Sequence, residues 1–327
     1  MSAPEGFPVE TTSVRTVTSD QIKSMYSKRA WREVSQVDQI GAGEANSLSL
    51  VKTSDGETEV IKVCPNEYGR ANKVKKAAWC AERAASLGIP TNSVKAIHEN
   101  DPYLGLFVVE KYLQGHEPNN LDQNERISTT KTLANYLAVI HKFQIAGAGE
   151  IDENGKGQED SWPIHISKWI NYIEEQIGNN PNSKLFIPSD LIARTFDDLR
   201  KNSWLIPNSN SLLHGDPNLK NTLIMGDGQV ALIDWDNSLS GDPLYDVAYF
   251  ESFHDDSTLN QEMRRAYGQA SGVDFYHAGV SNIKSRVNYY KKLIELSAVN
   301  WYLLKGDYNK FQNALTKLEK RMVPIKI

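Results

Sequence analysis

The stretch LLHGDPNLKNTLI, at residues 212–224, places a polar loop between two apolar runs. Short apolar runs that are bounded by turn residues are typical of buried strands. His214, Asp216 and Asn221 are therefore expected at one rim, beside the ends of two strands. Because Asp and Asn next to Gly and Pro also build ordinary turns, this loop taken alone favours a simple connection.

A further carboxylate follows the next apolar run. Residues 230–233 read VALI and lead directly into Asp234. Two neighbouring strands would then deliver Asp216, Asn221 and Asp234 to the same rim. Phosphoryl transfer requires such a set, because one Asp orients the attacking hydroxyl and accepts its proton, while an Asn and another Asp hold metal ions on the nucleotide phosphates. The pattern therefore indicates phosphoryl transfer.

Three motifs in this order resemble the aminoglycoside phosphotransferase family, a small-molecule branch of the protein-kinase-like fold. They are HGD at 214–216 with Asn221 five positions after the Asp, IDWD at 233–236, and GDPLYD at 241–246. The resemblance implies that Asp216 is the catalytic base and that Asn221 and Asp234 bind Mg²⁺. It also implies that His214 and Asp246 brace the catalytic loop. The implied fold class is α+β and bilobal, with a small antiparallel-sheet N-lobe carrying one helix and a larger, mostly helical C-lobe.

An N-lobe of this kind must cover the nucleotide. Residues 39–63 alternate as a hairpin does, with a turn at 54–56. Lys62 stands where the kinase signature has the lysine that holds the α- and β-phosphates. Gly41 and Gly43 form the expected glycine loop, which lacks the third glycine of protein kinases. These three residues are predicted to contact the nucleotide.

Two further segments complete the expected nucleotide site. Kinases pair the strand lysine with a helix glutamate, but the predicted helix within residues 71–90 has Ala78 where the family has that glutamate. Glu82 lies one turn further on and is the candidate partner, while a solvent-facing Glu82 is the alternative. The apolar strand before residue 115 resembles the family's hinge, where groups at Glu110 and Tyr112 would bind adenine.

We expect three regions along the chain. These are a flexible tail at residues 1–24, a nucleotide-binding N-lobe with its hinge at 25–115, and a helical C-lobe at 116–327 with the catalytic loop and substrate site. Residues 129–143 have the spacing of an amphipathic helix, with His141 in the core. A Gly-rich loop followed by Trp162 and a helix resembles hygromycin-type members of the family.

The distribution of charge predicts a cationic small-molecule substrate. Residues 221–263 contain no Lys or Arg but many acidic residues, and such a bias attracts and focuses cations. Glu251, Asp255 and Asp256 are candidate substrate contacts, because they lie just beyond the motif. Metal binding, loop bracing and a solvated face are the alternative explanation for these acids.

Composition excludes several classes of protein. The chain has 327 residues, a net charge of -5, 40% hydrophobic and 24% charged residues, which describes an ordinary globular protein and argues against a nucleic-acid partner. No apolar run approaches the roughly 18 residues of a membrane span, and the start of the sequence lacks the features of a secretory signal. Two cysteines, Cys64 and Cys80, do not suggest a disulfide framework. We therefore expect a cytoplasmic protein without a membrane partner, either monomer or homodimer.

These observations lead to one preferred function and two alternatives. The preferred function is transfer of a phosphoryl group from ATP, or alternatively GTP, with Mg²⁺, to a hydroxyl of an aminoglycoside antibiotic, as in a hygromycin-type resistance enzyme. The first alternative is a metabolic kinase of a small alcohol, sugar or amino alcohol, such as choline, homoserine or fructosamine. The second is a pseudokinase that binds a nucleotide without turnover.

Overall fold

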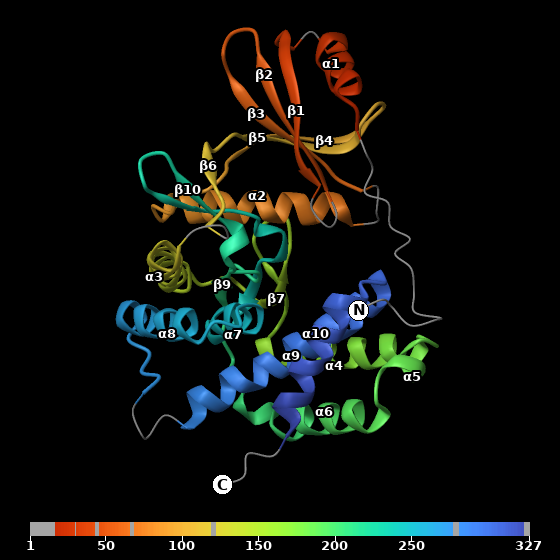
Figure 1. Cartoon of the computed structure of the whole chain (residues 1–327), viewed down its shortest axis with the longest axis vertical. Coiled ribbons are helices and arrows are strands. Elements are labelled where there is room, and N and C mark those ends of the chain that lie inside the picture. The colour runs from red at the N-terminus through yellow and green to blue at the C-terminus, as the bar shows by residue number, and fades with distance from the viewer. Residues whose placement is uncertain are drawn as a thin grey trace.

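The computed structural model describes residues 17–29, 31–42, 46–65, 69–118, 122–276 and 281–323. A five-stranded antiparallel sheet in the order β1-β2-β3-β5-β4 forms the N-lobe (Figure 1). Its strands are β1 (Val34–Ala42), β2 (Ser47–Thr53), β3 (Thr58–Val63), β4 (Val94–Asp101) and β5 (Gly105–Lys111). The turn between β2 and β3 contains Gly56, whose φ of 91° suits glycine. The predicted hairpin is therefore confirmed.

Helix α1 (Ser19–Lys28) covers one face of this sheet. It begins at a capping box in which Thr18 accepts from the Gln21 amide. Its apolar side packs on the buried strand residues, and the Tyr26 hydroxyl donates to Glu59 at 2.9 Å. The ordered N-lobe thus starts before residue 25, so the expected tail boundary was too late. Residues 1–16 of that tail lie outside the described residues.

Helix α2 (Arg70–Ser86) lies under the sheet and above the C-lobe in Figure 1. Val74 packs with Cys64, Leu106 and Val108 on the sheet face opposite α1. The helix ends where the sequence predicts, because Gly88 with a φ of 82° follows it. Ile61 and Val63 are buried toward α1, whereas Lys62 between them points to the α2 side.

The C-lobe contains the larger core and most of the helices. Its helices are α3 (Gln123–Ile140), α4 (Trp162–Asn179), α5 (Ser183–Phe186), α6 (Ser189–Lys201), α7 (Leu244–Phe253), α8 (Ser257–Ser271), α9 (Ser281–Lys305) and α10 (Tyr308–Met322). Helix α3 packs on α8, while α9 packs on both α7 and α10. One cluster of buried side chains runs through these helices and continues to Cys80 and Ala84 of α2. No helix of the described residues is long and apolar enough to cross a membrane.

Two small antiparallel sheets arrange the motif loops. The first has the order β11-β10-β6, and the second has the order β8-β7-β12-β9. Their strands are β6 (Gly115–His116), β7 (Ala148–Ile151), β8 (Gly157–Glu159), β9 (Ser211–Leu213), β10 (Thr222–Met225), β11 (Val230–Leu232) and β12 (Leu239–Gly241). Short 3-10 helices lie at Ser203–Leu205 (η2), Leu219–Asn221 (η3) and Trp235–Asn237 (η4). Since β9 pairs with β12 and β10 pairs with β11, both motif loops emerge side by side. The two-lobed α+β fold predicted from the sequence is confirmed.

Candidate active site

The loop after β9 is held by the buried carboxylate of Asp246 on α7. The backbone amides of His214 and Gly215 donate to its two oxygens at 2.8 and 2.9 Å. His141 Nε2 lies 3.0 Å from Asp246 Oδ2, and the other nitrogen of this ring lies 2.9 Å from the Tyr267 hydroxyl. Asp246 is fully buried and satisfied by three donors. The Asp246 carboxylate therefore joins α7, the loop after β9 and the ring of His141.

Gly215 is required at its position. Its φ is 82°, and a Cβ there would lie 1.8 Å from the Asn237 carbonyl oxygen. The close approach of two backbones brings the loop after β9 against the segment after β11. His214 adds a second connection, because its Nε2 lies 3.0 Å from the Ile233 carbonyl and its ring packs on Trp235. Both contacts attach the His214 ring to the residues on either side of Asp234.

The carboxylate of Asp216 is half-buried and held by its own loop. Asn218 Nδ2 donates to Oδ1 at 2.5 Å, and the Tyr249 side chain of α7 lies beside this carboxylate. Asn221 Nδ2 donates to the Asp216 backbone carbonyl at 2.9 Å. Burial raises the pKa of Asp216, although the neighbouring His214 and these hydrogen bonds oppose the change. A carboxylate with a raised pKa is better matched to accepting a proton.

Asp234 lies at the start of η4 in a left-handed backbone conformation, with a φ of 66°. This conformation is uncommon for a residue with a side chain and tends to occur at functional sites. Its side chain is 44% exposed, so it remains open to the space between the lobes. Trp235 fixes the segment on both sides, because its Nε1 donates to Thr91 at 2.9 Å and its ring packs on His214.

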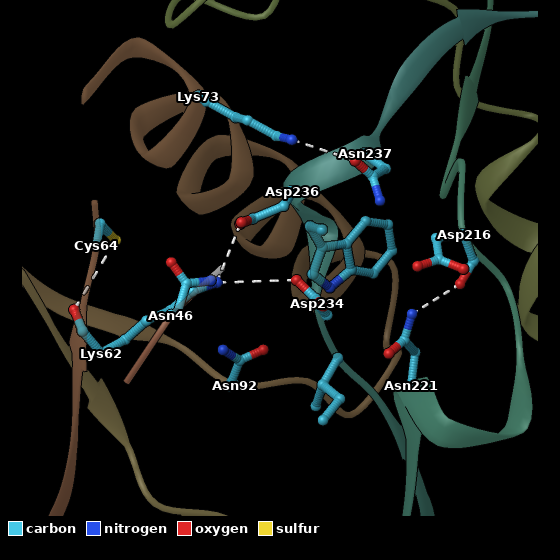
Figure 2. A network of polar contacts seen from close by, with 12 residues as sticks. Asn46, Lys62, Cys64, Lys73, Asn92, Asp216, Asn221, Asp234, Asp236 and Asn237 are labelled. Carbon is cyan, nitrogen blue, oxygen red and sulfur yellow. Dashed lines mark hydrogen bonds and ion pairs between the residues drawn. The ribbon is translucent and has the colours of Figure 1, made fainter. Parts of the chain in front are cut away.

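The side-chain oxygens of Asn221 and Asp234 suit Mg²⁺, which prefers oxygen ligands and also binds water and phosphate oxygens. Since Asn221 uses its nitrogen to bond the Asp216 backbone, its carbonyl oxygen is left for a ligand. In Figure 2 this oxygen turns toward the side on which Asp234 lies. Within the described ranges no group of three or more His, Cys, Asp and Glu residues could hold a metal. The two side chains therefore suit an ion that a nucleotide helps to hold.

Lys62 reaches across the cleft to the same segment (Figure 2). Its Nζ lies 3.1 Å from Asp236 Oδ1 and 3.8 Å from Asp234 Oδ1. Burial disfavours the ammonium, but these two carboxylates outweigh it and raise the pKa of Lys62. Glu82 is exposed on α2 and is not among the residues paired with Lys62 in the described part of the chain. The expected pairing with Glu82 is therefore not found, and the solvent-facing alternative holds.

The other residues that were predicted to bind the nucleotide lie in different places. A pocket between the lobes is lined by Lys62, Val74, Ala77, Ala78, Ala81, Asn92, Val94, Val108, Glu110, Asp234, Trp235 and Asp236. Glu110 lies within β5 between β3 and β4, so its side chain, which accepts from Asn92 at 2.8 Å, lines this pocket. Burial raises the pKa of Glu110. Tyr112 directly follows β5, and Gly41 belongs to β1, whereas Gly43 lies outside the described residues.

Basic side chains of α2 contact the segment after Asp234, which sequence reasoning did not anticipate. Arg70 Nη2 lies 2.9 Å from Asp236 Oδ2, and Lys73 donates to Asn237 at 3.3 Å. Lys76 is buried and donates to the Ser238 carbonyl at 3.1 Å and to Glu150 at 3.0 Å. The spacing of positions 70, 73 and 76 on one helix side was the available signal.

The three acids that were expected to contact a substrate have partners within the C-lobe. Glu251 is 3% exposed and forms ion pairs with Arg264 and Lys291. Asp256 accepts from the first amides of α8 and caps that helix. Asp255 lies 3.1 Å from Lys317 and is exposed. The absence of basic residues between 221 and 263 was misleading, because α8, α9 and α10 supply the compensating cations.

A second hollow opens beside β7, β8 and α4. It is lined by Glu150, Gln158, Glu159, His165, Lys168, Trp169, Tyr172 and Leu239. A chain of aromatic rings leads from it toward the catalytic loop: the ring centroids of Trp169 and Tyr245 are 6.0 Å apart, and those of Tyr245 and Tyr249 are 6.1 Å apart. The hollow also borders α2, because Glu150 in its lining pairs with Lys76 of that helix.

Several solved structures share this fold. The chain aligns with a thermostable mutant of aminoglycoside phosphotransferase APH(4)-Ia in ternary complex with ADP and hygromycin B, with a TM-score of 0.75 and 21% identity over 93% of this chain and 98% of that chain. The GDP complex of wild-type aminoglycoside 2'-phosphotransferase-IIIa gives 0.69 and 14% identity over 94% and 99%. Macrolide 2'-phosphotransferase MphH from Brachybacterium faecium gives 0.63 and 13% identity over 94% and 100%. At these identities the likeness shows the fold alone.

Sequence comparison identifies the family. No curated protein matches the chain. The model of the phosphotransferase enzyme family, APH, matches residues 36–281, which is most of the chain and includes all three motifs together with Lys62. The kinase-like fold and the arrangement of the motif loops agree with this match. The chain therefore belongs to the APH family of phosphotransferase enzymes.

Proposed function

We propose that this phosphotransferase moves the γ-phosphoryl group of ATP, or alternatively GTP, to a hydroxyl of a cationic small molecule, for which an aminoglycoside is the first candidate. The observation that carries the proposal is that Lys62 and Asp234 line one cleft between the lobes, while Asn221 and Asp216 are bonded to each other beside Asp234 (Figure 2). A purely structural cleft would have no need for a strained Asp234 or for an acid with a raised pKa.

Each residue has a defined part in this proposal. Lys62 holds the phosphates, as the strand lysine of kinase-like enzymes does. Asn221 and Asp234 would hold Mg²⁺, which supplies positive charge between the phosphate oxygens when it is bound. Asp216 orients the acceptor hydroxyl and takes its proton, while Asn218 donates to its carboxylate and keeps it in one orientation. Catalysis then consists mainly of positioning and charge stabilisation.

The second hollow supports a cationic acceptor. Glu150 and Glu159 offer carboxylates at its wall, and Trp169 and Tyr172 offer ring faces, which attract cations and pack against sugar rings. Both glutamates already have lysine partners, Lys76 and Lys168, at 3.0 and 2.6 Å. An acceptor with ammonium groups would replace or share those partners. Because ATP is a cytoplasmic substrate, we expect the protein to act in that compartment.

Two alternative functions are compatible with the same active-site residues. A metabolic kinase of a small alcohol, sugar or amino alcohol would use the same Asp216, Asn221 and Asp234, since the acceptor is selected by less constrained loops. A pseudokinase would bind the nucleotide without turnover. The intact set of Lys62, Asp216, Asn221 and Asp234 favours an active enzyme over the pseudokinase.

The test is Mg²⁺-dependent release of ADP or GDP against a panel of acceptors. The panel contains hygromycin B and other aminoglycosides, a macrolide, choline, homoserine and simple sugars. Asp216→Asn should lower kcat by about 10²- to 10⁴-fold, as expected for loss of a general base. Asp190→Asn is the matched control, because Asp190 is exposed on α6 and its ion pair among the described residues is with Arg194 on the same helix.

Each outcome selects one function. Turnover on an aminoglycoside that is lost in Asp216→Asn but kept in Asp190→Asn would support a resistance enzyme. Turnover only on choline, homoserine or a sugar would support a metabolic kinase with the same mechanism. Nucleotide binding with no turnover on any acceptor would favour the pseudokinase. Turnover that persists in Asp216→Asn would refute the role of Asp216.

A further inference from the structure

Helix α2 presents basic side chains to the cleft, where a kinase-type helix presents a glutamate to the strand lysine. Here Glu82 is the sole acidic residue of α2, it lies near the end of the helix, and it is exposed. The opposite charge faces the cleft, since Arg70, Lys73 and Lys76 all reach the segment 236–238. A buried Lys62 must therefore find its carboxylate elsewhere.

Asp236 provides that carboxylate, and its two oxygens contact two different elements of the N-lobe, β3 and α2. Oδ1 lies 3.1 Å from Lys62 Nζ, and Oδ2 lies 2.9 Å from Arg70 Nη2. The side chains of Lys62, Asp236 and Arg70 are only 11%, 11% and 8% exposed. Arg70 is itself fixed, because the same Nη2 donates to Asn46 at 2.8 Å. The three groups form a buried, continuous row from α2 through η4 to β3.

We infer that Asp236 is the positioning residue for the phosphate-binding lysine, in place of a helix glutamate, and that Arg70 couples the position of α2 to it. The inference rests on the proposed function, because it assigns Lys62 to the phosphates. Asp236 lies two residues after Asp234, so Lys62 and the predicted metal ligand are oriented by one short segment. A shift of α2 would move Arg70, then Asp236, and through it the ammonium of Lys62.

The experiment measures kcat and KM for MgATP and MgGTP with water as the acceptor, by ADP or GDP release, so that no unidentified acceptor is needed. Lys62→Met and Asp236→Asn should each lower kcat by about 10- to 100-fold with a smaller change in KM, as expected for lost positioning. Because the two residues act as a unit, the double variant should be no slower than Lys62→Met. Glu82→Gln should stay within about twofold of the wild type, since an exposed side chain without a contact to Lys62 contributes little.

Arg70 provides a second variant that leaves both Lys62 and Asp236 in place. Arg70→Gln should lower kcat by about 3- to 10-fold, and Arg70→Lys should restore most of it, because a cation near Asp236 is what matters. Thermal unfolding of every variant separates a loss of positioning from a loss of folding. A kcat that falls while Tm is unchanged supports positioning, whereas a proportional fall in both shows a merely structural contact.

Four outcomes would overturn the inference. Losses of Lys62→Met and Asp236→Asn that multiply in the double variant would show that the residues act independently. A Glu82→Gln defect as large as that of Asp236→Asn would return the helix glutamate to the role. A raised Mg²⁺ requirement in Asp236→Asn, with Lys62→Met unaffected, would make Asp236 a metal ligand. A wild type that neither binds nor hydrolyses ATP or GTP would overturn the proposed function as well.

Discussion

The two sides of the active site are held by different kinds of contact. On the C-lobe side, backbone amides of His214 and Gly215 donate to the fully buried Asp246. On the N-lobe side, the long side chains of Arg70 and Lys76 reach the segment after Asp234. Backbone amides have no rotamers to lose, whereas Lys and Arg side chains have many. We therefore expect the loop after β9 to be held more rigidly than the contact between the lobes.

Removing the brace should produce the largest effect. Asp246→Ala would leave the amides of His214 and Gly215 and the ring of His141 without their acceptor, at a cost of about 4 kcal/mol in the free energy of unfolding. Asp246→Asn should cost less, because it keeps one acceptor oxygen. Urea unfolding with ADP release measures both quantities. If Asp246→Ala unfolds like the wild type, the C-lobe side is not held in this way.

Crowding the catalytic loop should come next. Gly215→Ala would place a Cβ 1.8 Å from the Asn237 carbonyl oxygen at a φ of 82°, so we expect a loss of about 3 kcal/mol together with a loss of turnover. Gly56→Ala is the matched control. Gly56 also has a positive φ, but its Cβ would meet nothing within 4 Å, so only the backbone cost of about 1 kcal/mol applies. Equal losses in the two variants would show that the close approach is unimportant.

Charge buried inside the C-lobe should matter more than charge at its surface. Glu251→Gln leaves Arg264 and Lys291 without their carboxylate and should cost about 2 kcal/mol at pH 7. Glu262→Gln on α8 breaks more exposed pairs with Arg265 and Lys131 and should cost less than about 0.5 kcal/mol. Urea unfolding at several pH values measures the change in the free energy of unfolding for both variants.

The pH dependence of the Glu251 effect has a definite sign. Burial opposes its charge, but Arg264 and Lys291 outweigh burial and hold the pKa of Glu251 below its ordinary value. A lowered pKa in the folded state stabilises the protein above the unfolded pKa, near 4.5, and this contribution is lost as the pH falls through the folded value. The difference between wild type and Glu251→Gln should thus be complete at pH 7 and shrink below about pH 4.5. A difference that grows on acidification would contradict the assignment.

The smallest effect is expected at the contact between the lobes. Lys76→Met keeps the apolar stem but leaves the Ser238 carbonyl without its donor, so we expect a loss of about 1 kcal/mol and a severalfold fall in turnover. Lys75→Met is the control from the neighbouring position, because Lys75 forms only partly exposed pairs with Glu99 and Glu153. A larger loss in Lys75→Met would mean that surface pairs, not the buried donor, hold α2 to the C-lobe.

Sequence reasoning succeeded where function depends on local spacing. The hairpin that carries Lys62, the strand that leads to Asp234 and the two-lobed fold were all predicted, and the family match confirms the resemblance. It was wrong about Glu82, which is exposed and does not pair with Lys62. It was also wrong about Glu251, which forms an ion pair inside the C-lobe and is not part of an exposed acidic surface. The carboxylate partner of Lys62 lies on η4, and the cations that pair with Glu251 lie on α8 and α9, so neighbours in sequence did not identify them.

The sequence by itself therefore determined which chemistry this protein carries, because loop motifs and strand alternation are set by residues within a few positions of one another. Only the tertiary structure decided which charges meet. Lys62 and Asp236 are 174 positions apart, and His141 and Asp246 are 105 positions apart. Such pairs form because packing of the lobes and helices removes water from them, and a buried charge must then be matched by whatever opposite charge or donor the fold brings within reach.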